Sequence, residues 1–166
     1  MDRKSKLSCI FVMCLLVSGV SFGSTITATM PVTATVSNTC STVTANAIAF
    51  GEYNPLNATP GDADGNIAVT CTDNTPFDVS LNAGTTTGGS IANRKMAGPN
   101  GTNLAYNLYT DSGHDTVWGD GTTGSVVSGT GTGSAVNETV YGEVAAGQQG
   151  VEAGSYSDTV TVSVNY

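Results

Sequence analysis

The chain has 166 residues, with 13 acidic and 5 basic side chains and a formal net charge of −8. An acidic surface of this kind repels phosphate backbones and anionic lipid headgroups, which excludes nucleic-acid binding. The composition is rich in Gly, Thr, Ser and Val and poor in charged residues, which is typical of strands and turns rather than helices.

The first 23 residues have the parts of a secretory signal peptide. Arg3, Lys4 and Lys6 precede an apolar run over residues 7–20, and a small residue follows at Gly23. The apolar run is too short for a membrane-spanning helix. We therefore expect an exported chain that begins near Ser24 and is not inserted in a membrane. It would keep 5 − 3 = 2 basic and 13 − 1 = 12 acidic residues, a net charge of −10.

A period-two pattern runs from residue 25 to residue 36. One face carries Ile26, Ala28, Met30, Val32, Ala34 and Val36, and the other is mostly Thr. The pattern predicts a strand whose apolar face needs a sheet to cover it. That sheet is either in its own domain or in another molecule, and periodicity does not decide between them. Pro31 cannot donate a ladder hydrogen bond, so pairing is expected to be interrupted there.

Two of the four cysteines, Cys40 and Cys71, remain after removal of the signal peptide. An oxidising compartment favours one intramolecular disulfide between them, and two free buried thiols are the alternative. A bridge between positions 31 apart would stabilise the fold by about 3 to 4 kcal/mol in the chain-entropy description.

Alternating apolar residues mark the later strands. They are Ile67, Val69 and Cys71; Phe77, Val79 and Leu81; Leu104, Tyr106 and Leu108; Val136, Val140 and Val144; and Tyr156, Val160, Val162, Val164 and Tyr166 in a last strand that reaches the C-terminus. Glycine-rich turns, such as residues 82–90 and 119–133, separate them. We predict one all-β sandwich domain. Trp118 fits either its core or a surface contact.

Three motifs suggest chemistry, and we interpret each of them as a turn or loop. Residues 119–124 match G-x-G-x-x-G, but that motif binds a dinucleotide only when a helix follows it. Residues 62–65 resemble the start of a calcium loop but lack its later ligands. His114 lies near Asp111 and Asp115 without a nucleophile, so we expect a solvated loop. The sequence therefore predicts no enzyme, no cofactor and no metal site.

Several sequence blocks in this order resemble the spore coat protein U domain. They are Met30-x-Val32-x-Ala34-x-Val36-x-x-x-Cys40, AFGEYNP from Ala49, AVTCT around Cys71, NLYTD from Asn107, TVWGDG from Thr116, and TVYGEV followed by AGSYSDTVTVSVNY. Subunits of the archaic, Csu-type chaperone–usher pili share this domain. One departure is Ala145, which stands where the family's Pro-Ala-Gly turn has proline.

The resemblance implies an incomplete immunoglobulin-like β-sandwich that is completed by donor-strand exchange. Residues 24–37 would be the donor strand and residues 38–166 the pilin domain. The acceptor groove would lie beside the last strand, at Tyr156, Val160, Val162, Val164 and Tyr166. The implied partners are other copies or related pilins, a periplasmic chaperone and an outer-membrane usher.

The implied product is a surface fimbrium that supports adhesion or biofilm formation, reached through the periplasm. The alternative is a structural coat protein of a spore or cell surface that no chaperone and usher assemble. The two interpretations differ in whether residues 24–37 fold back on their own domain.

Overall fold

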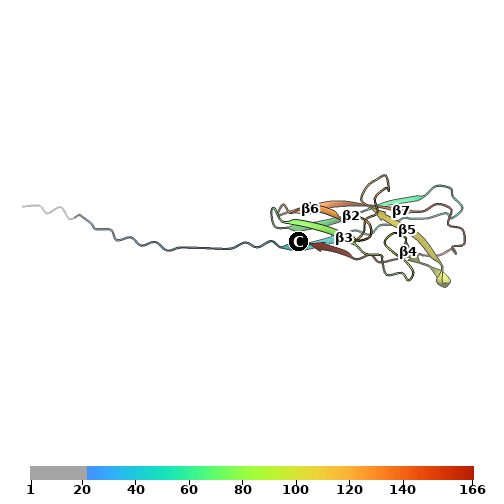
Figure 1. Cartoon of the computed structure of the whole chain (residues 1–166), viewed down its shortest axis with the longest axis horizontal. Helices are drawn as coiled ribbons and strands as arrows, with labels where there is room; N and C mark the ends of the chain where they lie inside the picture. The colour runs from blue at the N-terminus through green and yellow to red at the C-terminus, as the bar shows by residue number, and fades with distance from the viewer. Residues whose placement is uncertain (1–21) are drawn as a thin grey trace, which may run out of the picture. The chain divides into compact units, whose positions relative to one another are not determined.

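The computed structural model describes residues 22–166 of the chain. It contains two units, Met1–Thr35 and Val36–Tyr166. In the first unit, residues 22–35 form neither helix nor strand, and their side chains are exposed (Figure 1). Most of the predicted signal peptide, residues 1–21, lies outside the described residues. Among residues 22–166, no helix has the length and apolar character needed to cross a membrane.

The second unit consists of two antiparallel β-sheets that share one core (Figure 1). The five-stranded sheet has the order β1 (Cys40–Ala45), β2 (Gly61–Cys71), β7 (Ala135–Val144), β5 (Asn103–Tyr109) and β4 (Arg94–Ala97). The three-stranded sheet has the order β6 (Val127–Thr130), β3 (Pro76–Leu81) and β8 (Val162–Asn165). One 3-10 turn, η1 (Pro99–Gly101), precedes β5.

The predicted alternation is confirmed in the four central strands. The core contains the inward residues of β2, β3, β5 and β7, namely Ile67, Val69, Cys71, Phe77, Val79, Leu81, Leu104, Tyr106, Leu108, Val140 and Val144. Trp118 also belongs to the core and is fully buried. Its indole Nε1 donates a 2.9 Å hydrogen bond to the carbonyl of Val79, which joins the loop after β5 to the three-stranded sheet.

Three boundaries differ from the prediction. Residues 62–65, expected as a turn, lie inside β2, because every residue from Gly61 to Thr70 has a ladder partner in β7. The segment 119–133, expected as a turn, contains β6, which pairs with β3. The last strand is only Val162–Asn165, since residues 156–161 have a single bridge, between Ser157 and Ala97.

The predicted disulfide is present and joins Cys40 to Cys71. The two cysteines are register partners in the β1–β2 pair, where a bulge separates Cys40 from Thr42. The bridge therefore holds β1, at the edge of its sheet, against β2.

Arg94 is fully buried at the start of β4. Its guanidinium donates to the Asn107 Oδ1 at 2.7 Å, the Trp118 carbonyl at 2.8 Å and the Asn82 carbonyl at 2.9 Å. These acceptors come from β5, from the loop after β5 and from the end of β3. One buried cation thus fastens both sheets, and its burial lowers the pKa of the guanidinium.

Candidate functional site

Of the four strands that end the two sheets, β1 and β8 lie close to each other. β1 ends the five-stranded sheet and β8 ends the three-stranded sheet. Within residues 22–166, β1 pairs only with β2, and β8 pairs only with β3. Exposed strand edges present rows of free N–H and C=O groups that another chain can pair with.

A groove lies between the end of β1 and the start of β8 and continues between the segments next to them. One part, with a volume of about 430 Å³, lies between residues 45–50 after β1 and residues 156–162 before and within β8. A second part of about 870 Å³ continues between residues 48–55 and residues 151–156. Both parts are lined by Ile48, Phe50, Met96 and Tyr156. We therefore treat the two parts as one site and call it the edge groove.

The floor of the edge groove is the apolar core itself. Its buried lining residues come from β2, β3, β5 and β7 and are Ile67, Leu81, Leu104, Tyr106, Leu108 and Val140. A groove that exposes core side chains at an open edge is suited to bind an extended chain with alternating apolar residues.

Small residues on the inner faces of β2 and β7 position one wall of the groove. A Cβ at Gly65 would lie 2.6 Å from Ile48, and a Cβ at Gly142 would lie 3.0 Å from the ring of Phe50. Phe50 also meets the Tyr106 ring edge to face, with centroids 6.1 Å apart. These glycines therefore let the segment after β1 turn its apolar side chains onto the core.

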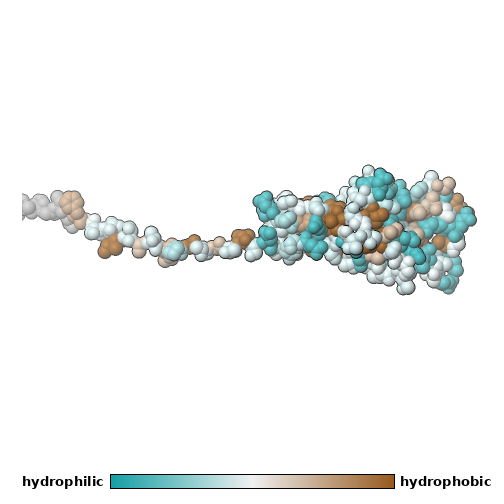
Figure 2. All heavy atoms as spheres, in the orientation of Figure 1, coloured by the Kyte–Doolittle hydropathy of each residue, from teal (hydrophilic) through white to brown (hydrophobic). Residues whose placement is uncertain are grey.

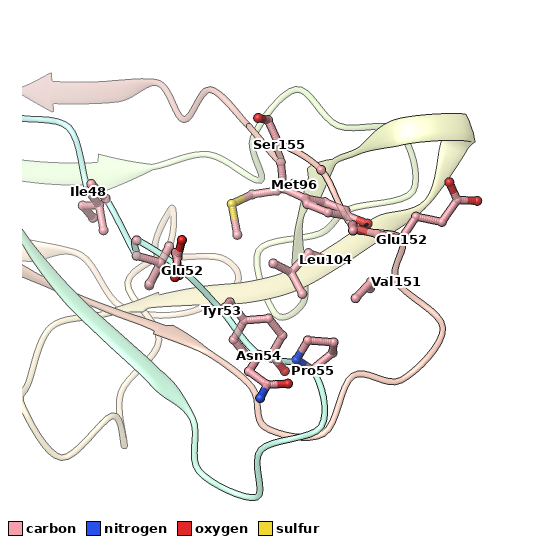
Figure 3. Close-up of a pocket in the computed structure, with 16 residues that line it drawn as sticks. Ile48, Glu52, Tyr53, Asn54, Pro55, Met96, Leu104, Val151, Glu152 and Ser155 are labelled. Carbon is pink, nitrogen blue, oxygen red and sulfur yellow. Dashed lines mark hydrogen bonds between the residues drawn. The ribbon is translucent and has the colours of Figure 1, made fainter.

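The far end of the groove is more polar. In Figure 3, Met96 and Leu104 point toward the space between the segment that carries Tyr53 and the segment that carries Val151. The Tyr53 hydroxyl donates a 2.7 Å hydrogen bond to the carbonyl of Ala145. The turn in which alanine replaces the expected proline is thus tied to this end of the groove.

Asp158 fixes the other wall. Its Oδ2 accepts a 2.7 Å hydrogen bond from the Tyr106 hydroxyl, and its Oδ1 accepts from the backbone N–H groups of Thr85 and Thr86 at 2.9 and 3.0 Å. Burial alone would raise the pKa of Asp158, but these hydrogen bonds, that of Tyr106 foremost, outweigh it and lower the pKa. Burial and then the bond to Asp158 raise the pKa of Tyr106.

Asp158→Asn is expected to cost stability in a pH-dependent way. A carboxylate whose pKa is lowered by folding stabilises the protein above its unfolded pKa of about 3.9, and this contribution disappears as the pH falls through the folded value. We expect the free energy of unfolding of the variant to be about 1 to 3 kcal/mol lower than that of the wild type at pH 7. The difference should be smaller at pH 3. Urea titrations at both pH values measure this, with Glu52→Gln, an exposed site, as the control. A difference independent of pH would contradict the assignment.

The structure brings only part of the predicted acceptor strand to the groove. Tyr156, Val160 and Val162 line it. Val164 packs partly buried against the core, whereas Tyr166 is 62% exposed and does not line either part.

The predicted donor residues are exposed and unpaired within the described part of the chain. Ile26 is 95% exposed, and Met30, Val32 and Val36 are 85 to 87% exposed, as are Ala28 and Ala34 by class. Figure 2 shows apolar side chains recurring along this segment. Their role as a donor remains a prediction.

Comparisons with known proteins agree on the family. The Spore Coat Protein U domain model matches residues 26–163. Among solved structures, a chain in the CsuC–CsuE complex of a chaperone with a tip adhesion subunit, from the archaic chaperone–usher Csu pili of Acinetobacter baumannii, is 28% identical with a TM-score of 0.54. The match covers 80% of this chain and 40% of that one, so this chain spans less than half the length of that relative.

A second solved structure, the P pilus rod subunit PapA, is 18% identical with a TM-score of 0.45, over 73% of this chain and 92% of that one. No curated protein matches the chain. The two sheets form the immunoglobulin-like β-sandwich that the sequence predicted. Because the family model covers residues 26–163, the protein belongs to the Spore Coat Protein U domain family.

Proposed function

We propose that the protein is a structural subunit of a surface fibre in which each copy inserts residues 24–37 into the edge groove of the next. The observation that carries this proposal is the coincidence, in one chain, of an apolar groove at two open strand edges and an exposed segment with the alternating pattern that such a groove binds. The chain is a structural protein rather than an enzyme, since its family and its similar structures are coat and pilus proteins.

Burial of the donor residues provides a sufficient driving force. Ile26, Met30, Val32 and Val36 together would contribute on the order of 6 to 12 kcal/mol as an upper estimate. Backbone pairing with β1 and β8 would add to it. The contact is heterologous, because each copy gives one strand and accepts another, so copies add head to tail and form a fibre when the rotation between them does not close a ring.

Strand directions limit how the chain could fill its own groove. β1 and β4 point the same way in their sheet, and Ser157 pairs antiparallel to Ala97 of β4, so β8 runs opposite to β1. A donor antiparallel to β8 must therefore lie parallel to β1. The four steps from Val36 to Cys40 reach about 14 Å, whereas a parallel return past the 6 residues of β1 needs about 20 Å. This distance favours a donor from another molecule over residues 24–37 of the same chain.

We infer the rest of the assembly route from the relatives. A periplasmic chaperone would cover the edge groove before assembly, an outer-membrane usher would catalyse the exchange, and the fibre would support adhesion or biofilm formation. The CsuC–CsuE complex, which pairs a chaperone with a pilus subunit, supports the first of these steps.

Removal of the donor segment tests the proposal. The exported chain beginning near Ser24 is expected to form ladders that survive cold detergent and dissociate on heating. The same chain without residues 24–37 is expected to stay monomeric with an intact Cys40–Cys71 bridge. When the two chains are mixed, a truncated copy can accept a donor strand from the wild type but has none to give. Each truncated copy should therefore end one fibre, and the ladder should become shorter. Unchanged ladders after the deletion would refute the donor assignment and favour a coat protein assembled in another way.

A further inference from the structure

Three side chains distant in sequence meet on the outer face of the five-stranded sheet. Asp62 of β2 and Glu143 of β7 are direct register partners, and His114 from the loop after β5 lies beside them. The ligand atoms of the three residues all lie within 4.8 Å of one another. His114 Nδ1 is 3.6 Å from a carboxylate oxygen of Glu143, and the two side chains are only 18% and 25% exposed.

The surrounding loop holds the imidazole in this position. The Asp111 carboxylate accepts hydrogen bonds from the backbone N–H groups of Gly113, Asp115 and Thr116. The ring of Tyr109 packs against that of His114, edge to face, with centroids 5.0 Å apart. The imidazole is thus directed toward Glu143 by contacts that do not involve Asp62 or Glu143.

The electrostatics of the cluster favour a bound cation. Carboxylates directly opposite each other on one sheet face repel and destabilise the pair. The only lysine and arginine after residue 23 are Arg94, which is buried against other partners, and Lys95. A divalent ion would neutralise both carboxylates at a place where the protein provides neither lysine nor arginine.

The donor types indicate which ion fits. Imidazole nitrogen with two carboxylates suits zinc and similar transition ions, whereas calcium takes six to eight oxygen ligands. Zinc bonds of about 2.1 Å in a tetrahedral arrangement separate neighbouring ligand atoms by about 3.4 Å. The distance between His114 and Glu143 is close to this value, at 3.6 Å. The whole set lies within 4.8 Å, and Asp62 is exposed, so its side chain can rotate toward the ion.

We propose that Asp62, His114 and Glu143 bind one divalent transition-metal ion, best matched by zinc, with water in the remaining coordination position. The ion ties the loop after β5 to β2 and β7. None of the three residues lines the edge groove, so the ion stabilises the sandwich independently of strand exchange.

Zinc titration of the full mature chain, prepared without a polyhistidine tag, tests the proposal. Isothermal calorimetry is expected to show one zinc ion per chain, and thermal unfolding to shift upward with zinc but not with equal calcium or magnesium. His114→Asn keeps a residue that tolerates the left-handed backbone at φ 56° and removes the imidazole. We expect this variant and Glu143→Gln each to bind zinc at least about tenfold more weakly.

Asp64→Asn and Asp115→Asn are the matched controls, because they neutralise neighbouring acids outside the three-residue set. Both should bind zinc as the wild type does. Absence of zinc binding by the wild type at millimolar concentration, or equal affinity in His114→Asn, would overturn the proposal. Near-UV circular dichroism without metal verifies that each variant is folded, and detergent-resistant ladders, measured separately, report on the proposed function alone.

Discussion

Val32→Asp is expected to abolish fibre formation, whereas Thr33→Asp leaves it intact. In the proposed donor strand, alternate residues face the groove, so Val32 enters the apolar floor and Thr33 faces solvent. The substitution at residue 32 forfeits about 1.5 to 3 kcal/mol of side-chain burial and adds a carboxylate desolvation cost of several kcal/mol. A loss of about 5 kcal/mol corresponds to a dissociation constant weaker by between three and four orders of magnitude.

The measurement is the length of the detergent-resistant ladder on unheated gels, with electron microscopy of the same samples. Thr33→Asp is a matched control, because it adds the same charge one position away and changes the net charge of the chain by the same amount. Val32 follows Pro31 directly, which makes it the first residue on the far side of the interruption in the ladder. If both variants form fibres equally well, the apolar face of residues 26–36 does not enter a groove.

The sandwich could be predicted because inward and outward positions of its core strands carry different types of residue, and this difference is visible in the local sequence. The large inward residues of β2, β3 and β5 alternate with polar or small ones, and burial follows that alternation in the structure except at Asn107, which is buried. The turn predicted at residues 62–65 is wrong because their turn-like composition is local, whereas their pairing with β7 is a contact between residues about 80 positions apart. Strand ends such as those of β8 depend on which neighbour is present.

Only one wall of the edge groove could be predicted from the sequence. Periodicity predicts Tyr156, Val160 and Val162 on a strand, and the family resemblance implies a groove beside them. The opposite wall, with Ile48 and Phe50, lies outside any strand and could not be predicted in this way. The AFGEYNP block marked it as a distinctive segment without revealing its place. Asp158 and the grouping of Asp62, His114 and Glu143 could not be predicted, since their partners are brought together only by the tertiary fold.

Arg94→Met is expected to destabilise the fold more than Asp158→Asn does. In the sequence, Arg94 counted only as one of two cations, but in the structure it is 0% exposed and satisfies acceptors from three segments. Methionine fills similar space and leaves the carbonyls of Asn82 and Trp118 and the Asn107 side chain without those donors. Loss of a buried charged group's hydrogen bonds costs about 3 to 5 kcal/mol, a large part of the roughly 5 to 15 kcal/mol typical of a domain.

Urea unfolding followed by the fluorescence of Trp118 measures the effect, since Trp118 is buried in the core and its carbonyl accepts a hydrogen bond from Arg94. Lys95→Met is the control, because it removes the neighbouring, partly exposed cation from the same strand. If Arg94→Met and Lys95→Met lower the free energy of unfolding by similar amounts, the hydrogen bonds of Arg94 do not stabilise the fold as we expect. Because Arg94 joins the end of β3 to β4 and β5, its loss should also disorder the floor of the edge groove near Leu81 and Tyr106. The variant is therefore expected to accept a donor strand poorly even where it remains folded.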